Sequence, residues 1–402
     1  MNGKGLLSVD EALGVLLAGA RPVSEIEQVA TLEATGRVLA RAQASTMDVP
    51  PMDNSAMDGY ALRLADVSAP EARLRVAQRI PAGAVGKPLD PGTAARIFTG
   101  APIPPGADAI VMQEFCAADG EHVIVKKVPQ RDEWIRRRGS DIRAGEEVLA
   151  AGVRLRPQDT GLAASVGIQS LPVRRRVRLA LFFTGDELVM PGDPLPPGRI
   201  YNSNRFTLNG LAKTFDCEVH DFGIVPDSLA ATRDVLRRAA AEADVIVTSG
   251  GVSVGEEDYV RPAVEAEGSL LMWKIAMKPG RPLAFGKVGA AAFIGLPGNP
   301  VSSFVTFLVF VRPFLRKTQG IAQVAPRAIE ARADFDWLKP DSRREFLRVK
   351  WNPQGGLDLY PTQDSAVLTS TAWADGLVDN PPNHPVAKGE RVRFLPFSEL
   401  YG

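Results

Sequence analysis

The fold is indicated most clearly by residues 244–255, which read DVIVTSGGVSVG. In this stretch the apolar run Asp244 to Thr248 leads through Ser249 into a pair of glycines. The apolar run Arg178 to Phe183 leads in the same way into the sequence TGDEL. Between these runs lie two helical stretches and one strand-like stretch, at residues 204–215, 228–241 and 217–225. Strands that alternate with helices of this length predict a doubly wound, mostly parallel sheet with helices on both faces.

The rest of the chain has a different texture on each side of this sheet. From Ser8 to Ala42 the apolar spacing is helical, and Pro157 to Val166 begins like a helix. From about Thr46 to Val148, many prolines and glycines break short apolar runs, which predicts a β-rich unit. Short strands such as Phe346 to Val349 predict a small β-barrel at the C-terminal end. We therefore predict a multidomain α/β and β protein of four units, namely an elongated helical linker at 1–45 with 146–176, a β-rich unit at 46–145, the doubly wound unit at 177–325 and a C-terminal β-barrel at 326–402.

The composition argues against several classes of protein. Lysine plus arginine equals aspartate plus glutamate, at 47 each, so the chain has no bulk charge for nucleic acid or an anionic membrane. The two cysteines, Cys116 and Cys217, match no zinc spacing and are too few for a disulfide framework. The N-terminus lacks a signal-peptide pattern, and the most apolar long segment, Val301 to Leu315, predicts a buried helix. We therefore expect a cytoplasmic protein with neither a nucleic-acid nor a membrane partner.

Three motifs are candidates for a binding site beside the predicted sheet. Parallel sheets bind ligands beyond the carboxyl ends of their strands, where Glu187 and the pair Gly250 and Gly251 fall. Adjacent glycines let backbone N–H groups converge on an anion, and the hydroxyls of Ser249 and Ser253 favour phosphate or pterin. The third motif begins a predicted helix, which is a natural seat for an anion, at Pro297, Gly298 and Asn299. Each motif also has a plain structural interpretation as a turn or as a helix cap, including Asp258 and Asn299 as caps.

Three further segments carry charge that is suited to anions or metal ions. Lys274 and Lys278 alternate with apolar residues, so one strand would direct both lysines to the same face, although lysines are also common on solvated edge strands. The loop PPMDNSAMDGYA at 50–61 contains two acids and a serine among turn-forming residues. The sequence IRRRGSD at 135–141 is either a solvated face or a phosphate contact.

Five of these segments occur in the order that is typical of one family. They are PMDNSAMDGY, TGDEL, SGGVSVG, MKPGRP and LPGNP, at residues 51–60, 184–188, 249–255, 277–282 and 296–300. In this respect the chain resembles the molybdopterin molybdenumtransferases of the MoeA family, which is similar to the E domain of gephyrin. The resemblance covers nearly the whole chain. It implies a four-domain homodimer that joins molybdate to the dithiolene of adenylylated molybdopterin and releases AMP, with magnesium as cofactor.

The resemblance also implies roles for individual residues, in an active site between the doubly wound unit of one subunit and the β-rich unit of the other. The catalytic residues would be Asp58, Thr99, Asp141, Glu187 and Asp258. Magnesium prefers oxygen ligands, and the implied ligands are Glu187, Asp227 and Asp258. The substrate-binding residues would be Ser249, Gly250, Gly251, Ser253, Pro297, Gly298, Asn299, Lys274, Lys278, Arg348 and Ser365. One departure is Trp134, where the family usually has an asparagine before the arginine run.

Two rival functions share part of this pattern. A molybdopterin adenylyltransferase would have the sheet and the glycine loop, but it would not need the other three units, which fill more than half of the chain. A non-catalytic scaffold similar to gephyrin would keep the fold, but the intact Asp58, Glu187, Asp258, Lys274 and Lys278 argue for catalysis. A contact with the adenylyltransferase of the same pathway is a further expectation, since that enzyme would supply the substrate.

Overall fold

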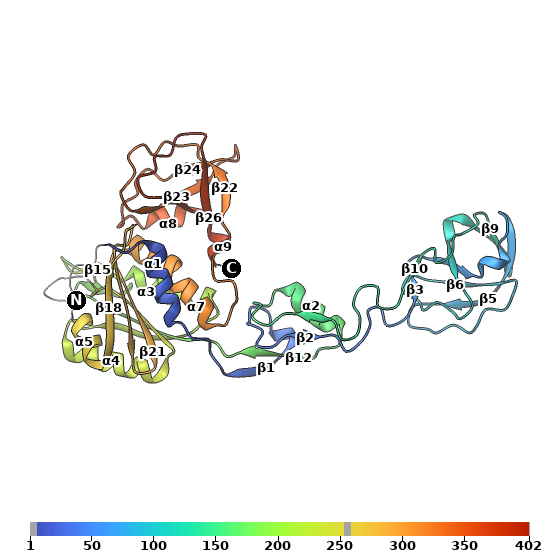
Figure 1. Cartoon of the computed structure of the whole chain (residues 1–402), viewed down its shortest axis with the longest axis horizontal. Helices are drawn as coiled ribbons and strands as arrows, with labels where there is room; N and C mark the ends of the chain where they lie inside the picture. The colour runs from blue at the N-terminus through green and yellow to red at the C-terminus, as the bar shows by residue number, and fades with distance from the viewer. Residues whose placement is uncertain (1–5, 253–258, 402) are drawn as a thin grey trace.

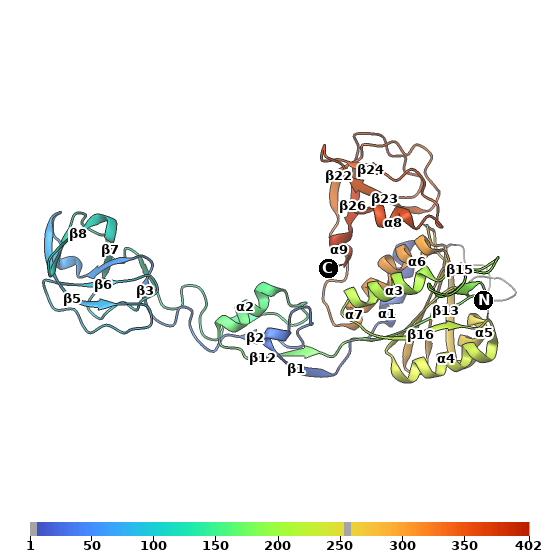
Figure 2. The same ribbon diagram turned by 180° about the vertical axis from the view of Figure 1, so that it is seen from behind.

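The computed structural model describes residues 6–252 and 259–401. Figure 1 shows an elongated molecule, with the β-rich unit at one end and the doubly wound and C-terminal units at the other. A narrow linker made of two distant chain segments joins the two ends, and the view from behind in Figure 2 shows the same arrangement. Within these residues no helix has the length and apolar character that a membrane span requires.

The doubly wound unit is built on a six-stranded sheet in the order β16-β13-β17-β21-β20-β18. The first four strands are parallel and the last two run antiparallel to their neighbours. In chain order the strands are β13 (Arg178–Thr184), β16 (Glu218–Val225), β17 (Val245–Ser249), β18 (Gly268–Lys274), β20 (Pro282–Val288) and β21 (Ala291–Leu296). A small two-stranded parallel sheet beside them consists of β14 (Leu188–Val189) and β15 (Ile200–Tyr201).

Helices cover both faces of this sheet, as the sequence predicts. Alternate residues of β13 belong to different cores, with Leu181 in one and Phe182 in the other. The first face packs on α1 (Val9–Gly19), α3 (Ser203–Thr214), α6 (Pro300–Thr306), the π-helical segment η4 (Phe307–Val311) and α7 (Arg312–Thr318). The second face packs on α4 (Leu229–Glu242) and α5 (Val260–Glu267). The segment Val301 to Leu315 is thus buried and helical, as predicted.

The helical pattern from Ser8 to Ala42 is only partly realised. Ser8 and Glu11 form a capping box, which starts α1, but the helix ends at Gly19. The chain then forms β1 (Ile26–Ala30), which pairs with the distant β12 (Ser170–Arg174). Moreover, α1 packs in the core of the doubly wound unit, although its residues fall in the range predicted for the linker. The prediction was wrong after Gly19 because a partner strand 140 or so residues away leaves no trace in a local pattern.

The linker leads from the doubly wound unit to the β-rich unit at the far end of the molecule (Figure 1). The linker also contains η1 (Thr31–Glu33), β2 (Gln43–Ala44), β11 (Glu147–Leu149) and α2 (Pro157–Ser165). The β-rich unit has a six-stranded sheet in the order β7-β4-β6-β5-β9-β8. Its elements are β3 (Asn54–Ser55), β4 (Gly59–Leu62), η2 (Leu64–Asp66), β5 (Ala72–Ile80), β6 (Thr93–Ile97), β7 (Ala109–Met112), η3 (Gln113–Phe115), β8 (Cys116–Asp119), β9 (His122–Val125) and β10 (Ile135–Arg136).

The C-terminal unit is a small barrel whose sheet includes one strand, β19, from the segment of the doubly wound unit. The strands lie in the order β19-β23-β25-β26-β22, with β24 beside β23. A bridge between Ala333, just after β22, and Leu357 of β24 closes the sheet around its own core. The elements are β19 (Met277–Lys278), β22 (Ile329–Arg332), β23 (Arg344–Trp351), β24 (Leu357–Leu359), α8 (Thr369–Trp373), β25 (Gly376–Asn380), β26 (Arg391–Pro396) and α9 (Phe397–Tyr401). Because β19 joins this barrel, the two units are connected at the carboxyl edge of the larger sheet.

Candidate functional site

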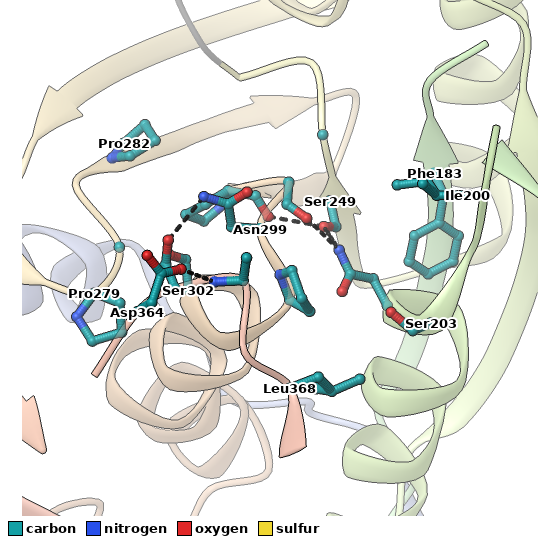
Figure 3. A pocket seen from close by; sticks show the side chains of 18 of the residues that line it. Phe183, Ile200, Ser203, Ser249, Pro279, Pro282, Asn299, Ser302, Asp364 and Leu368 are labelled. Carbon is teal, nitrogen blue, oxygen red and sulfur yellow. Dashed lines mark hydrogen bonds between the residues drawn. The ribbon is translucent and has the colours of Figure 1, made fainter. Parts of the chain in front are cut away.

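A cavity of about 930 Å³ lies where three parallel strands of the doubly wound sheet end. Its wall includes Thr184 at the end of β13, Ser249 at the end of β17, and Pro297 directly after β21. Figure 3 shows Ser249 in the middle, with Phe183 and Ile200 on one side and Pro279 and Asp364 on the other. The strand-end motifs predicted from the sequence therefore meet at one site.

Hydrogen bonds from Asn204 hold these strand ends together. Its Nδ2 donates to Ser249 Oγ at 2.9 Å and to the carbonyl oxygen of Gly298 at 2.7 Å. Ser249 Oγ in turn donates to the carbonyl oxygen of Pro297 at 2.9 Å and accepts from Ser303 Oγ at 3.2 Å. Asn204 was not among the predicted site residues, because a polar residue near a helix start carries no sign of its distant partners. These bonds fix the floor of the cavity.

The glycine pair after β17 is required by the backbone and by close packing. Gly250 and Gly251 have φ values of 98° and 63°, in the left-handed region that favours glycine. A Cβ on Gly250 would lie 2.7 Å from the carbonyl oxygen of Thr184. A Cβ on Gly251 would lie 2.5 Å from Val260 Cγ2. The pair therefore lets the chain pass against β13 at the cavity wall.

Two of the three predicted metal ligands share a recess beside the cavity. Glu187 and Asp227 line this recess, which measures about 280 Å³, together with Thr184 and both glycines. Thr184 Oγ1 is buried there and has no hydrogen-bond partner within the described residues. Asp227 accepts from the backbone N–H of Asp186 at 3.0 Å, whereas the cap of α4 is Ser228.

Asp258 and Ser253, the remaining predicted residues of this edge, lie outside the described residues. Among the residues that are described, no group of three or more histidines, cysteines or acids could hold a metal ion. Glu187 and Asp227 alone therefore form an incomplete oxygen-ligand set in the described part of the chain.

Cationic side chains also line the cavity. Lys278, Arg281 and Arg343 are part of its wall, but Lys274 is not. Lys274 ends β18, whereas Lys278 lies in the separate strand β19. The prediction that one strand directs both lysines to one face was therefore wrong, because the chain leaves the larger sheet between them.

Two of these three cations form ion pairs with carboxylates of the C-terminal unit. Lys278 Nζ lies 3.2 Å from Glu345 Oε1 and 3.6 Å from Asp341 Oδ2. Arg343 donates two hydrogen bonds to Asp341, at 2.8 and 2.7 Å, and these hold the pKa of that carboxyl well below its usual range. Arg281 is exposed and forms no ion pair within residues 6–252 and 259–401.

A loop of the C-terminal unit closes the cavity, and Arg348 supports that loop from behind. Ser365 lines the cavity and accepts from Asn299 Nδ2 at 3.0 Å, so the side chain of Asn299 binds this loop and does not cap α6. Arg348 does not line the cavity, and its guanidinium donates to the carbonyl oxygen of Asp364 at 3.1 Å. Burial lowers the pKa of Arg348 to about 10, so it stays charged at neutral pH. Sequence reasoning missed Gln363 and Asp364, which also line the cavity.

The predicted residues of the β-rich unit lie at the other end of the molecule (Figure 1). Asp58 Oδ1 accepts from the backbone N–H and the hydroxyl of Thr99, at 2.8 and 2.7 Å, and these bonds lower the pKa of Asp58. Asp141 is exposed on the loop after the arginine run. Trp134 has a φ of 59°, a conformation that asparagine adopts more easily than tryptophan. Within one chain these residues do not reach the cavity.

Comparisons with known proteins agree with this architecture along the whole chain. Residues 7–167 match the MoeA N-terminal region (domain I and II), residues 180–317 a probable molybdopterin binding domain, and residues 330–397 the MoeA C-terminal region (domain IV). A molybdopterin molybdenumtransferase of Haemophilus influenzae is 38% identical over 405 residues, which cover 99% of this chain and 100% of that protein. The chain belongs to the MoeA family.

Other members of the MoeA family support the assignment. A molybdopterin molybdenumtransferase of a Nostoc species is 41% identical over 322 residues, which cover 78% of this chain and 74% of that protein. The crystal structure of a molybdopterin biosynthesis MoeA protein from Pyrococcus horikoshii has a TM-score of 0.85 at 30% identity. The match covers 98% of this chain and all of that one, so the arrangement of units is that of the family.

Proposed function

We propose that this chain is a molybdopterin molybdenumtransferase, which inserts molybdate into the dithiolene of adenylylated molybdopterin and releases AMP. The observation that carries the proposal is the cavity itself, in a chain that aligns end to end with a relative of that name. Its volume of about 930 Å³ suits a substrate much larger than an oxyanion alone. Its walls combine polar strand ends with the cations Lys278, Arg281 and Arg343.

The residues of the cavity suggest a division of tasks. Lys278, Arg281 and Arg343 would bind the molybdate dianion or a substrate phosphate through charge-assisted hydrogen bonds. Ser249 and the glycine pair would contact the pterin or the pyrophosphate through a hydroxyl and backbone N–H groups. During the reaction water attacks the pyrophosphate, so that AMP leaves and the pterin keeps its own phosphate. Both dithiolene sulfurs bond to molybdenum, and their two thiol protons leave with one molybdate oxygen as water.

Magnesium fits the recess that adjoins the cavity. Glu187 and Asp227 offer carboxylate oxygens, and the buried hydroxyl of Thr184 has no protein partner in the described chain. These are oxygen donors of the kind that magnesium takes in preference to nitrogen or sulfur. When bound, the metal would supply positive charge against the pyrophosphate. Glu187 and Asp227 are the residues of the described chain that would hold it.

We also propose that the enzyme works as a homodimer whose active site lies between subunits. The family resemblance assigns Asp58, Thr99 and Asp141 to the site, yet they lie at the far end of the chain from the cavity. A symmetric dimer would bring the β-rich unit of each subunit to the cavity of the other, and it would repeat that contact twice.

The test is incubation of the purified protein with adenylylated molybdopterin, molybdate and magnesium. AMP release and formation of active cofactor should depend on all three, and a chelator should stop both. An adenylyltransferase would instead make adenylylated molybdopterin from molybdopterin and ATP, so that reaction is measured in parallel. Adenylation without molybdate-dependent AMP release would refute the proposed function, and inactivity in both assays would favour a scaffold.

A further inference from the structure

We propose that Glu345 of the C-terminal barrel is a positioning residue that holds Lys278 in place at the cavity. The effect on turnover rests on the proposed function, but the contact between the two residues does not. The barrel would then be part of the catalytic apparatus, because it fixes a cation that belongs to the other unit.

The pairing of β19 with β23 brings the two side chains together. These strands are parallel, and Lys278 is opposite Glu345 in their register. Lys278 Nζ donates to Glu345 Oε1 at 3.2 Å. The side chain of Glu345 is 0% exposed and that of Lys278 is 34% exposed, so the bond leads from a buried anion to the cavity wall.

Lys278 is the cation nearest to the charge of Glu345 in the described chain. The other carboxylate oxygen, Oε2, accepts from Trp337 Nε1 at 2.7 Å, from the backbone N–H of Asp341 at 3.1 Å and from Asn380 Nδ2 at 3.5 Å. These donors are all neutral. A buried carboxylate is costly without an opposite charge. Lys278 supplies that charge for Glu345.

The surroundings of Lys278 leave its ammonium little freedom. Asp341 lies 3.6 Å away, and its carboxylate already accepts two hydrogen bonds from Arg343. The indole ring of Trp337 lies 5.8 Å from the lysine nitrogen. A flexible lysine loses entropy when it binds an anion, and a lysine held in advance loses less. Glu345 thereby supplies preorganisation and touches no substrate itself.

The experiment compares Glu345→Gln with Glu345→Asp and with the matched control Asp379→Asn. Asp379 is a buried carboxylate on the neighbouring strand β25, and it pairs with Arg344, outside the cavity wall. Acylation of Lys278 by an N-hydroxysuccinimide ester is followed by mass spectrometry. Its rate should rise about ten-fold in Glu345→Gln, the lower end of what a hydrogen bond to a charged group contributes. It should rise less in Glu345→Asp and stay unchanged in Asp379→Asn.

In the AMP-release assay, Glu345→Gln should raise KM for molybdate about ten-fold or more with a smaller change in kcat, because a binding contact is weakened. In a Lys278→Met background the same substitution should add nothing, since Glu345 acts through that lysine. Unchanged acylation of Lys278 overturns the proposal, as does an unchanged KM beside faster acylation. If the wild type releases no AMP, the proposed function fails separately. Equilibrium dialysis then measures how much molybdate each protein retains. Lower retention by Glu345→Gln than by wild type supports the role of Glu345, and equal retention overturns it.

Discussion

Mixing two inactive variants should restore activity if the active site is shared between subunits. Asp58→Ala damages the β-rich half of the site, and Glu187→Ala damages the half at the sheet. In a mixed dimer one pocket carries both lesions and the other carries neither. Random pairing of equal amounts makes half of the dimers mixed, and one of their two pockets is intact, so activity should recover to about one quarter of wild type.

The assay is molybdate-dependent AMP release after co-expression or subunit exchange, with the mixed dimer verified by two affinity tags. The matched control mixes Asp58→Ala with Thr99→Ala, which damage the same half of the site. In that mixed dimer each pocket carries one lesion, so no recovery is expected. The reasoning is refuted if verified mixed dimers of Asp58→Ala and Glu187→Ala are no more active than their parents. A fully active monomer would refute it as well.

Three further outcomes follow from particular contacts. The bonds from Thr99 lower the pKa of Asp58, so Thr99→Val should raise that pKa and move the loss of the ionised carboxylate to higher pH, as measured by carboxyl NMR titration. Gly251→Ala should lower the free energy of unfolding by more than the roughly 1–2 kcal/mol expected for Gly198→Ala, a positive-φ glycine with open space around it. Arg348→Met should leave buried carbonyl groups unpaired and lower the stability of the barrel by about 1–3 kcal/mol in thermal unfolding.

The sheet and the strand-end part of the site were predictable because their causes are local. Apolar β-branched runs that alternate with helical stretches determine a parallel sheet, and carboxyl ends of parallel strands meet at one edge. Glu187 and Ser249 could therefore be expected together, and the predicted helix start at Pro297 was expected beside the sheet. The cavity contains all three. The family resemblance added the residues of the β-rich unit, whose proposed place in the site is not indicated by local patterns.

The part of the site contributed by the barrel could not be predicted from the sequence. Arg343 and Gln363 reach the cavity because β19 pairs with β23, and neither strand carries a sign of its partner. The same pairing separates Lys274 from Lys278, which alternation in the sequence had placed on one strand. Arg348 was expected to bind substrate, but it is buried and has three carbonyl or hydroxyl partners, so it supports the loop. Long-range pairing decided each of these outcomes.

Under the proposed function, the charges of the cavity wall suggest how it would accept a dianion without being strongly cationic. Lys278 is compensated by Glu345, and Arg343 by Asp341, so these two cations add little net charge. Their carboxylate partners instead fix where the donor groups lie. Arg281 has no carboxylate partner in the described chain and contributes a full positive charge. Attraction would therefore depend mainly on Arg281 and on metal near the recess, whereas selection among oxyanions would depend on the geometry of the paired donors.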